Sequence, residues 1–221
     1  MAYILNIETS NEFCSVCIAK DGNVIAAIRE ETANNHAKVL TLHIQQLFEQ
    51  ANLTIADMSA IAVNKGPGSY TGLRIGLSVA KGLCYGADLP LIALSAFDII
   101  IYDMISKNQQ KKGSYLALID ARRQDAYMAL YNETMEAILP DGFLTICEQT
   151  LVDFSKFGPV FIGGDANFKI KKEWLGDFGT LVENFIYDAD KMAQLSFQKF
   201  VKNETELVAY FEPYYLKNFG K

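Results

Sequence analysis

The chain has 221 residues, half of them hydrophobic, and its 26 acidic and 20 basic side chains give a formal net charge of −6. A chain of this length and composition can bury the core of one large domain or two small ones, which excludes disorder as the dominant state. The acidic balance gives the chain no basic surface with which to hold a nucleic acid unaided.

Three short apolar segments open the chain and predict an antiparallel meander of three strands. They cover residues 3–8, 14–19 and 23–29, and Asp21-Gly22 between the last two is a strong hairpin signal. From residue 34 the apolar period changes to a helical one, with Leu40, Ile44, Leu47 and Phe48 on one face. A helix of about 14 residues therefore follows the meander.

The next elements alternate between strands and helices. Residues 60–64 predict a short buried strand, a glycine-proline turn follows, and residues 73–86 have helical periodicity. Residues 90–94 predict another strand, and Ser95 can cap a helix that reaches about residue 106. The polar segment 108–114 has no apolar periodicity and predicts a linker.

The second half also mixes strands and helices. The pattern predicts strands over residues 115–120, 124–131 and 160–162 and a late helix over residues 188–201. We therefore expect two lobes, residues 1–107 and 108–221, with a last helix or tail that can pack back on the first lobe. Two successive mixed α/β domains, the first opening with a meander, describe the two-lobed ATPase architecture of actin, Hsp70 and the sugar kinases.

The amino-terminal segment lacks the pattern of a targeting signal. No basic leader precedes its apolar run, and Glu8 and Glu12 interrupt that run early. No stretch of the chain approaches the ~20 apolar residues of a membrane span. The four cysteines lack the pattern of a small secreted scaffold. These features predict a cytoplasmic protein that does not enter a membrane.

The hydroxyl-rich turn after the first strand is a candidate phosphate-binding turn. It consists of Glu8, Thr9 and Ser10, whose backbone N–H groups and hydroxyls could face a phosphate. The turn has no glycine to let its backbone approach a phosphate closely. The alternative is that Thr9 and Ser10 only close a hairpin.

The segment GPGSYTGLRIG, residues 66–76, is the most distinctive motif in the chain. Its glycines allow a sharp turn into a helix whose amino terminus could receive an anion, but the spacing is not that of a Walker A loop. Gly72, Gly76 and Ala80 follow at i, i+4 and i+8 and form a stripe with almost no side chain. Such a stripe admits a second backbone, which belongs either to this chain or to another subunit.

Metal binding and nucleophilic catalysis find no support in the sequence. The two histidines, His36 and His43, are seven residues apart, which separates them by about 10.5 Å along a helix, too far to share one zinc ion. No HExxH or GxSxG motif occurs in the chain. We therefore expect no catalytic residue, no metal site and no cofactor.

Two further motifs have an ordinary alternative. Gly163, Gly164 and Asp165 follow a strand and could lie against the adenosine of a nucleotide, although Gly-Gly is common in turns. The basic pair Arg122-Arg123 and the lysines at 169, 171 and 172 are too few for a nucleic-acid patch. We interpret them as solvated charge.

Taken in order, these motifs resemble the TsaB (YeaZ) family. The segments that carry the resemblance are ILNIETS, GPGSYTGLRIGLSVAKGL, LPLIALSAFDII, IDARRQDAY, FIGGDA and EPYYL, which cover nearly the whole chain. The opening and the glycine turn are also similar to TsaD, the catalytic paralogue. TsaD has a His-x-x-x-His pair that holds its metal, whereas the corresponding region here reads LIALSAFDII and has no histidine.

The resemblance implies an actin/Hsp70-like (ASKHA) fold with ribonuclease H-like domains and a degenerate nucleotide cleft at Glu8, Thr9, Ser10 and the segment 163–165. It also implies a non-catalytic subunit that supports synthesis of N6-threonylcarbamoyladenosine (t6A) on tRNA. Its partners would be TsaD and TsaE, with tRNA contacted only through the complex and a homodimer formed when the chain is alone. The alternatives are a stand-alone ATP-dependent phosphotransferase and, less favoured, a metallopeptidase.

We expect the partner interface on the helices over residues 36–49 and 71–86 of the first lobe. The glycine stripe would admit the partner's backbone, and neighbouring leucines would supply apolar contact area. The predicted interface residues are Leu40, Ile44, Gly72, Leu73, Gly76, Leu77, Ala80 and Leu83.

Overall fold

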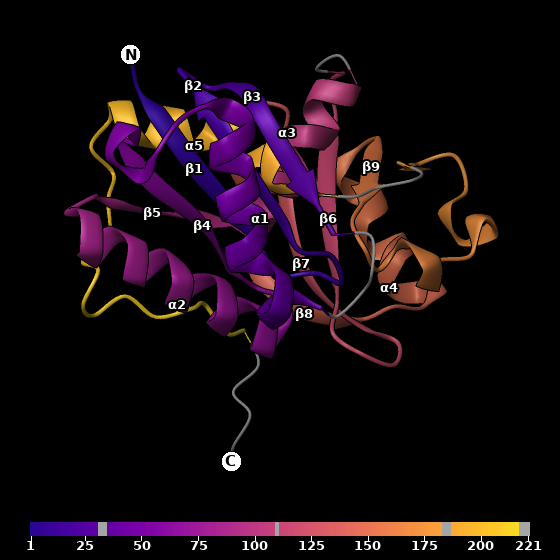
Figure 1. Cartoon of the computed structure of the whole chain (residues 1–221). Helices are drawn as coiled ribbons and strands as arrows, with labels where there is room; N and C mark the ends of the chain where they lie inside the picture. The colour runs from indigo at the N-terminus through magenta and orange to yellow at the C-terminus, as the bar shows by residue number, and fades with distance from the viewer. Residues whose placement is uncertain (31–34, 109–110, 183–186, 217–221) are drawn as a thin grey trace. The chain divides into compact units, whose positions relative to one another are not determined.

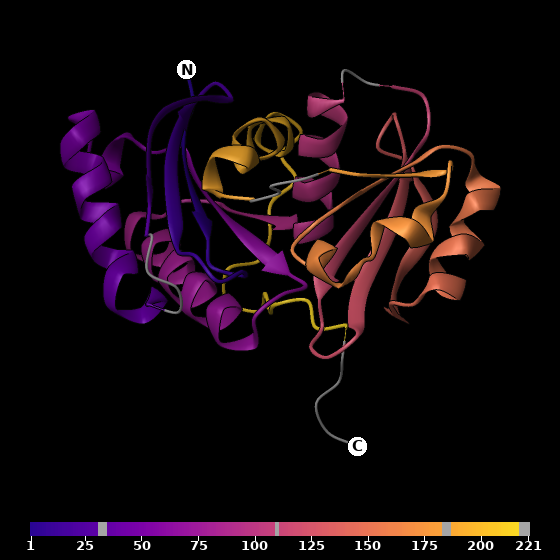
Figure 2. The same cartoon turned by 90° about the vertical axis from the view of Figure 1, so that its right-hand side faces the viewer.

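The computed structural model describes residues 1–30, 35–108, 111–182 and 187–216. The chain forms two compact units (Figures 1 and 2). The first comprises Met1–Ala96 and Asp188–Tyr215, and the second comprises Phe97–Tyr187 and, from the carboxyl end, Leu216. The predicted linker, of which residues 109 and 110 lie outside the described residues, thus falls inside the second unit, and the late helix belongs to the first.

The first unit is built on a five-stranded sheet in the order β3-β2-β1-β4-β5. β1 pairs antiparallel with β2 and parallel with β4, and β4 pairs parallel with β5. The predicted meander and the alternation after it are confirmed, although Asn34, where the first helix was expected to begin, lies outside the described residues. The elements are β1 (Tyr3–Glu8), β2 (Ser15–Lys20), β3 (Asn23–Arg29), α1 (His36–Ala51), η1 (Ile55–Asp57), β4 (Ala60–Gly66), α2 (Tyr70–Ala87), β5 (Leu91–Ser95), η5 (Ala189–Met192) and α5 (Ala193–Val201).

Helices cover both faces of this sheet, as Figure 2 shows. α1 and α2 pack on one face, where Leu5, Val16, Leu40 and Ala80 belong to one buried cluster. α5 packs on the other face, against β1 and β5. The strands β1, β2 and β4 are therefore covered on both faces, and nearly all of their residues are buried.

The second unit repeats the topology of the first. Its sheet has the order β10-β9-β6-β7-β8, in which β6, β7 and β8 form an antiparallel meander and β9 pairs parallel with β6. Written from its other edge, the order is β8-β7-β6-β9-β10, which corresponds strand by strand to β3-β2-β1-β4-β5 of the first sheet. The elements are α3 (Ala96–Lys107), β6 (Ser114–Asp120), β7 (Asp125–Asn132), β8 (Ala137–Thr145), α4 (Glu148–Val152), η2 (Asp153–Phe157), β9 (Val160–Gly163), η3 (Asn167–Lys169), η4 (Lys172–Leu175) and β10 (Gly179–Leu181).

The edge strands β8 and β10 are among the elements that the sequence pattern does not predict, as is the short helix α4. β8 contains Pro140, Asp141 and Gly142 in its middle, and these residue types normally interrupt a strand. They are tolerated because β8 is an edge strand, whose pairing with β7 shifts register near Leu130. β10 has three residues, too few for a period to be recognised.

The carboxyl-terminal segment also runs along the first unit. Glu206 forms an isolated antiparallel bridge with Leu91. The Lys81 ammonium donates to the carbonyl oxygens of Ala209 (3.1 Å) and Phe211 (3.2 Å), and the Tyr214 N–H donates to the carbonyl oxygen of Lys65 (2.7 Å). These long-range bonds hold residues of the carboxyl-terminal segment against the amino-terminal part of the first unit.

Candidate functional site

The candidate phosphate-binding turn is occupied by the chain's own carboxylate. Glu8 ends β1, and its Oε1 accepts the Ser10 N–H at 2.5 Å. Its Oε2 accepts the Asn64 side-chain N–H at 2.5 Å, and the same amide nitrogen lies 2.9 Å from the Ser10 hydroxyl oxygen. The Ser10 N–H of the turn and the Asn64 amide are therefore already directed at Glu8.

Glu8 is fully buried within the first unit. Burial raises the pKa of its carboxyl group from 4.5 to about 7, against the opposing effect of the hydrogen bonds from Ser10 and Asn64. The nearby Asp188 carboxylate raises the pKa further. A carboxyl group that is buried, twice hydrogen-bonded and without a basic partner in these contacts fixes the turn rather than receiving a ligand.

The glycine stripe of α2 packs against this same turn. The Thr9 hydroxyl donates to the Gly72 carbonyl oxygen at 2.8 Å. A Cβ atom at position 72 would lie 1.9 Å from the Thr9 carbonyl oxygen, and one at position 76 would lie 2.2 Å from Thr9 Oγ1. The backbone that the stripe admits is the chain's own.

This packing bears directly on the predicted interface. Gly72, Gly76 and Ala80 face the turn and the core, so their surface is not open to a second subunit. Four of the predicted apolar residues are also buried in the first unit, namely Leu40, Ile44, Leu73 and Leu77. Leu83 is partly buried. An interface on these two helices remains a prediction, and it would have to use their outer faces.

A groove on the first unit marks one such outer face. It has a volume of about 520 Å³ and lies along α1, η1 and α2. Its apolar lining includes Ile44, Phe48, Val79 and Leu83, and Thr41 and Gln45 are exposed positions on its border. The other lining residues are Glu49, Asn52, Leu53, Thr54 and Ile55.

The second group of predicted cleft residues lies in the second unit and supports a turn there. A Cβ atom at Gly163 would lie 2.3 Å from the Met104 sulfur. Gly164 has φ +132°, and a Cβ atom there would lie 2.0 Å from the Leu118 carbonyl oxygen. Packing within the unit therefore requires glycine at position 164, whereas a methyl group at position 163 would require the Met104 side chain to move.

Asp165 connects this segment to the turn between β6 and β7. Its Oδ1 accepts the backbone N–H of Asp120 at 2.7 Å, and the Tyr187 hydroxyl lies 3.5 Å from its Oδ2. Burial raises the pKa of Asp165 to about 6. These contacts show what the motif does inside the second unit, which is to fix the end of β6.

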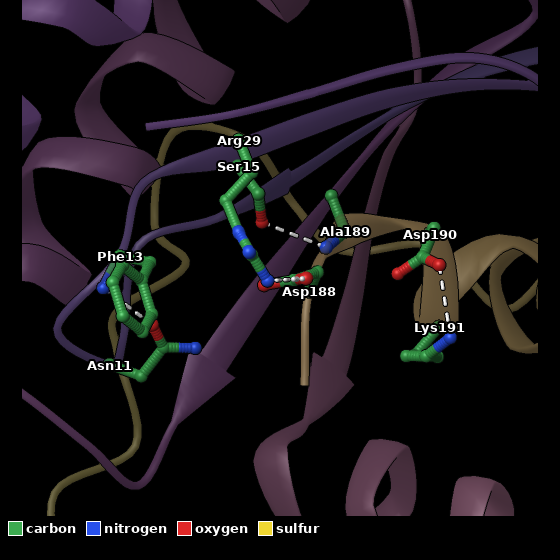
Figure 3. Close-up of polar contacts among 8 residues, drawn as sticks. All are labelled: Asn11, Phe13, Ser15, Arg29, Asp188, Ala189, Asp190 and Lys191. Atoms are coloured by element: carbon green, nitrogen blue, oxygen red, sulfur yellow. Dashed lines mark hydrogen bonds and ion pairs between the residues drawn. The ribbon is translucent and has the colours of Figure 1, made fainter. Parts of the chain in front are cut away.

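The polar contacts at Asp188 were not predicted from the sequence. The Arg29 guanidinium forms an ion pair with the Asp188 carboxylate at 3.2 Å, and the Ala189 N–H donates to the Ser15 hydroxyl oxygen at 2.9 Å (Figure 3). Burial is the main cause that raises the pKa of Asp188. These contacts join η5 to β2 and β3, and no local pattern could have indicated them because 159 residues separate Arg29 from Asp188.

The structure offers neither a metal centre nor a membrane-spanning helix in its described part. Among residues 1–30, 35–108, 111–182 and 187–216, no three His, Cys, Asp or Glu side chains form a group that could hold a metal ion. Over the same ranges, no helix has the length and apolar character needed to cross a bilayer.

Comparison with known proteins finds relatives among the proteins of tRNA threonylcarbamoyladenosine synthesis. A model of the TsaD family, described as tRNA N6-adenosine threonylcarbamoyltransferase, matches residues 23–175. The tRNA threonylcarbamoyladenosine biosynthesis protein TsaB of Escherichia coli K12 is 31% identical over 97% of this chain and 94% of its own length.

The solved structures agree with this result. The structure of YeaZ from Pseudomonas aeruginosa has a TM-score of 0.79 at 22% identity and covers 98% of this chain and all of its own. An activator of 2-hydroxyisocaproyl-CoA dehydratase from Clostridium difficile, solved with bound ADPNP, has a TM-score of 0.53 at 10% identity over 93% of this chain and 98% of its own.

The chain contains two mixed sheets with the same strand order. Together with the family model and the solved structures, they define an α/β protein of the actin/Hsp70-like ATPase fold, as predicted. In this chain the turn after the first strand is filled by a glutamate. The chain belongs to the TsaB family.

Proposed function

We propose that this chain is a non-catalytic subunit in the synthesis of t6A on tRNA and that it pairs with the TsaD enzyme. The observation that carries the proposal is family membership over nearly the full chain. It is supported by the turn at Glu8, where the Ser10 N–H is bonded to the Glu8 carboxylate and the Thr9 hydroxyl to the Gly72 carbonyl oxygen. TsaE would join the pair, and the chain alone would form a homodimer.

Three cysteines and one histidine of the first unit are poorly suited to catalysis, which favours a non-catalytic role. Burial raises the pKa of the Cys14, Cys17 and Cys84 thiols to about 12, so they do not form the thiolate that a nucleophile requires. His36 is buried, with its Nε2 3.0 Å from the Asn11 carbonyl oxygen. We therefore assign the transfer of the threonylcarbamoyl group to TsaD.

The groove along α1 and α2 is our candidate for the TsaD-binding surface. The TsaD family model matches the part of this chain that contains both helices, so the two proteins share the elements needed for a pseudo-symmetric pair. Such a pair and a homodimer would use the same patch and would exclude each other. The apolar lining of the groove suits the core of an interface.

Substitutions in the groove should separate association from folding. We expect Leu83→Glu to reduce capture of TsaD about a hundredfold, because a partner would leave the new charge buried and unpaired. Thr41→Arg, at an exposed position on the groove border, should have a similar effect without a cost in folding. The measurement is pull-down with TsaD from the same genome, together with size exclusion.

Leu42→Glu is the matched control, because Leu42 is 55% exposed on α1 and does not line the groove. It should leave capture of TsaD unchanged. If both groove variants are folded and still capture TsaD as the wild type does, the interface lies elsewhere.

Nucleotide binding by the isolated chain should be weak. The Ser10 N–H is already bonded to Glu8, and the turn has no glycine that would let its backbone approach a phosphate closely. We therefore expect a Kd for Mg·ATP of millimolar order or weaker, about −4 kcal/mol or less favourable. Titration calorimetry measures this directly, and the Clostridium difficile activator that was solved with ADPNP is a suitable positive control. A micromolar Kd for Mg·ATP would show that the turn at Glu8 does not prevent nucleotide binding.

A further inference from the structure

The turn between β6 and β7 presents two arginines in an unusual backbone conformation. Arg122 has φ +74° and Arg123 has φ +49°. This left-handed region favours glycine, asparagine and aspartate over residues with long side chains. Two consecutive arginines there are a poor choice for the turn itself, so their side chains need a separate explanation.

Internal contacts hold this turn firmly. The Arg122 N–H donates to the Asp120 Oδ1 at 2.8 Å, and the Asp125 N–H donates to the Arg122 carbonyl oxygen at 3.0 Å. The Lys169 ammonium, whose side chain is 3% exposed, pairs with the Asp120 carboxylate and donates to the Asp125 carbonyl oxygen at 2.6 Å. Asp165 fixes the backbone of Asp120 from the other side.

These contacts use the neighbouring acidic groups and leave the guanidinium groups free. Asp120 is engaged by Lys169, and the Asp125 carboxylate accepts the Thr145 hydroxyl at 2.8 Å. Arg122 and Arg123 are exposed, and across the described part of the chain neither guanidinium has an ion pair or a side-chain hydrogen bond. The buried Lys169 thus neutralises the Asp120 carboxylate, whereas the Arg122 and Arg123 side chains are exposed.

From this arrangement we propose that the β6–β7 turn contacts RNA phosphates when the chain acts in its complex, with Arg122 and Arg123 as the contacting residues. The planar guanidinium fork is well suited to phosphate oxygens. The exposed residues of the turn are Arg122, Arg123 and Gln124, and all are polar. That surface fits a hydrated polyanion better than the apolar core of a protein interface.

The inference rests on the proposed function, since we do not expect a chain with a net charge of −6 to hold RNA alone. The turn would add a local contact to a complex whose other subunits provide most of the binding. It would also give this subunit a direct contact with tRNA, whereas the resemblance implies contact only through the complex.

The test replaces both arginines by residues that suit the turn. Arg122→Asn with Arg123→Gly keeps a positive φ favourable, so the melting temperature should stay the same or rise. We expect the variant complex with TsaD to bind an unmodified tRNA transcript at least about tenfold more weakly. The slope of log K against log salt should decrease by about 0.7 to 0.9 for each lost phosphate contact.

The matched control is Lys111→Gln with Lys112→Gln, an exposed cationic pair beyond the opposite end of β6. It should change neither the affinity nor the slope. Capture of TsaD is measured for every variant, so that failure of the proposed function is seen separately from failure of this inference.

An unchanged salt slope for the arginine variant would overturn the proposal, as would a wild-type complex that does not bind the transcript. Loss of TsaD capture by the arginine variant would also overturn it, because the turn would then be a protein contact.

Discussion

Gly72→Ala is expected to destabilise the protein by about 3 kcal/mol, or to prevent folding, because the new methyl group would overlap a backbone atom. Its Cβ would lie 1.9 Å from the Thr9 carbonyl oxygen. The turn cannot retreat easily, since the Glu8 carboxylate holds Ser10 and Thr9 itself is bonded to α2. Urea denaturation followed by circular dichroism gives the free energy of unfolding.

Gly82→Ala on the same helix is the matched control. Gly82 is exposed, and a Cβ atom there would have no neighbour within 4 Å. Alanine is the better helix former by about 1 kcal/mol, so this variant should be slightly more stable than the wild type. Opposite signs for the two substitutions distinguish close packing from helix propensity.

Gly76→Ala refines this prediction. A Cβ atom there would meet the side chain of Thr9 at Oγ1, whereas the one at position 72 would meet the backbone. Thr9→Ala removes Oγ1 and should relieve much of the cost of Gly76→Ala, but not that of Gly72→Ala. If Gly72→Ala is as stable as the wild type, the Thr9 carbonyl oxygen does not lie within 1.9 Å of the Cβ position at residue 72.

Glu8→Gln should remove a pH dependence of stability of about 3 kcal/mol. The pKa of Glu8 is about 7 in the folded protein and near its ordinary 4.5 when unfolded. Between these values the folded state retains a proton that the unfolded state has lost, so the free energy of unfolding decreases as the pH rises from 4.5 to 7 and is constant above 7. A glutamine does not titrate.

The measurement is the free energy of unfolding of both proteins between pH 5 and pH 8. As the pH rises, the free energy of unfolding of the variant should increase relative to that of the wild type. The glutamine NH2 group must face a hydrogen-bond donor, and this adds an offset that does not depend on pH. Glu204→Gln makes the same chemical change at an exposed position and should give no such trend. Parallel curves for Glu8→Gln and the wild type would show that Glu8 titrates as an ordinary glutamate.

Local patterns in the sequence were sufficient to predict most helices and strands. The meander over β1 to β3, the helices α1 and α2 and the strands β4 to β7 follow from periods of two or 3.6 and from glycine and proline signals. The order and spacing of the motifs were sufficient to predict the TsaB family, and the similarity to the Escherichia coli protein confirms it. The edge strand β8 escaped prediction because its Pro140, Asp141 and Gly142 are acceptable only where a strand has one free edge.

Only the tertiary structure decided what the distinctive residues do. The spacing of Gly72, Gly76 and Ala80 shows that something approaches α2 closely, but a spacing within one helix cannot say what, and the structure places Thr9 there. The carboxylate of Glu8 could have faced a ligand or its own turn, and its partner Asn64 is 56 residues away. In the same way, Asp165 reaches Asp120 across 45 residues. Side-chain direction and long-range partners depend on how the strands are ordered in each sheet, and no local period in the sequence contains that order.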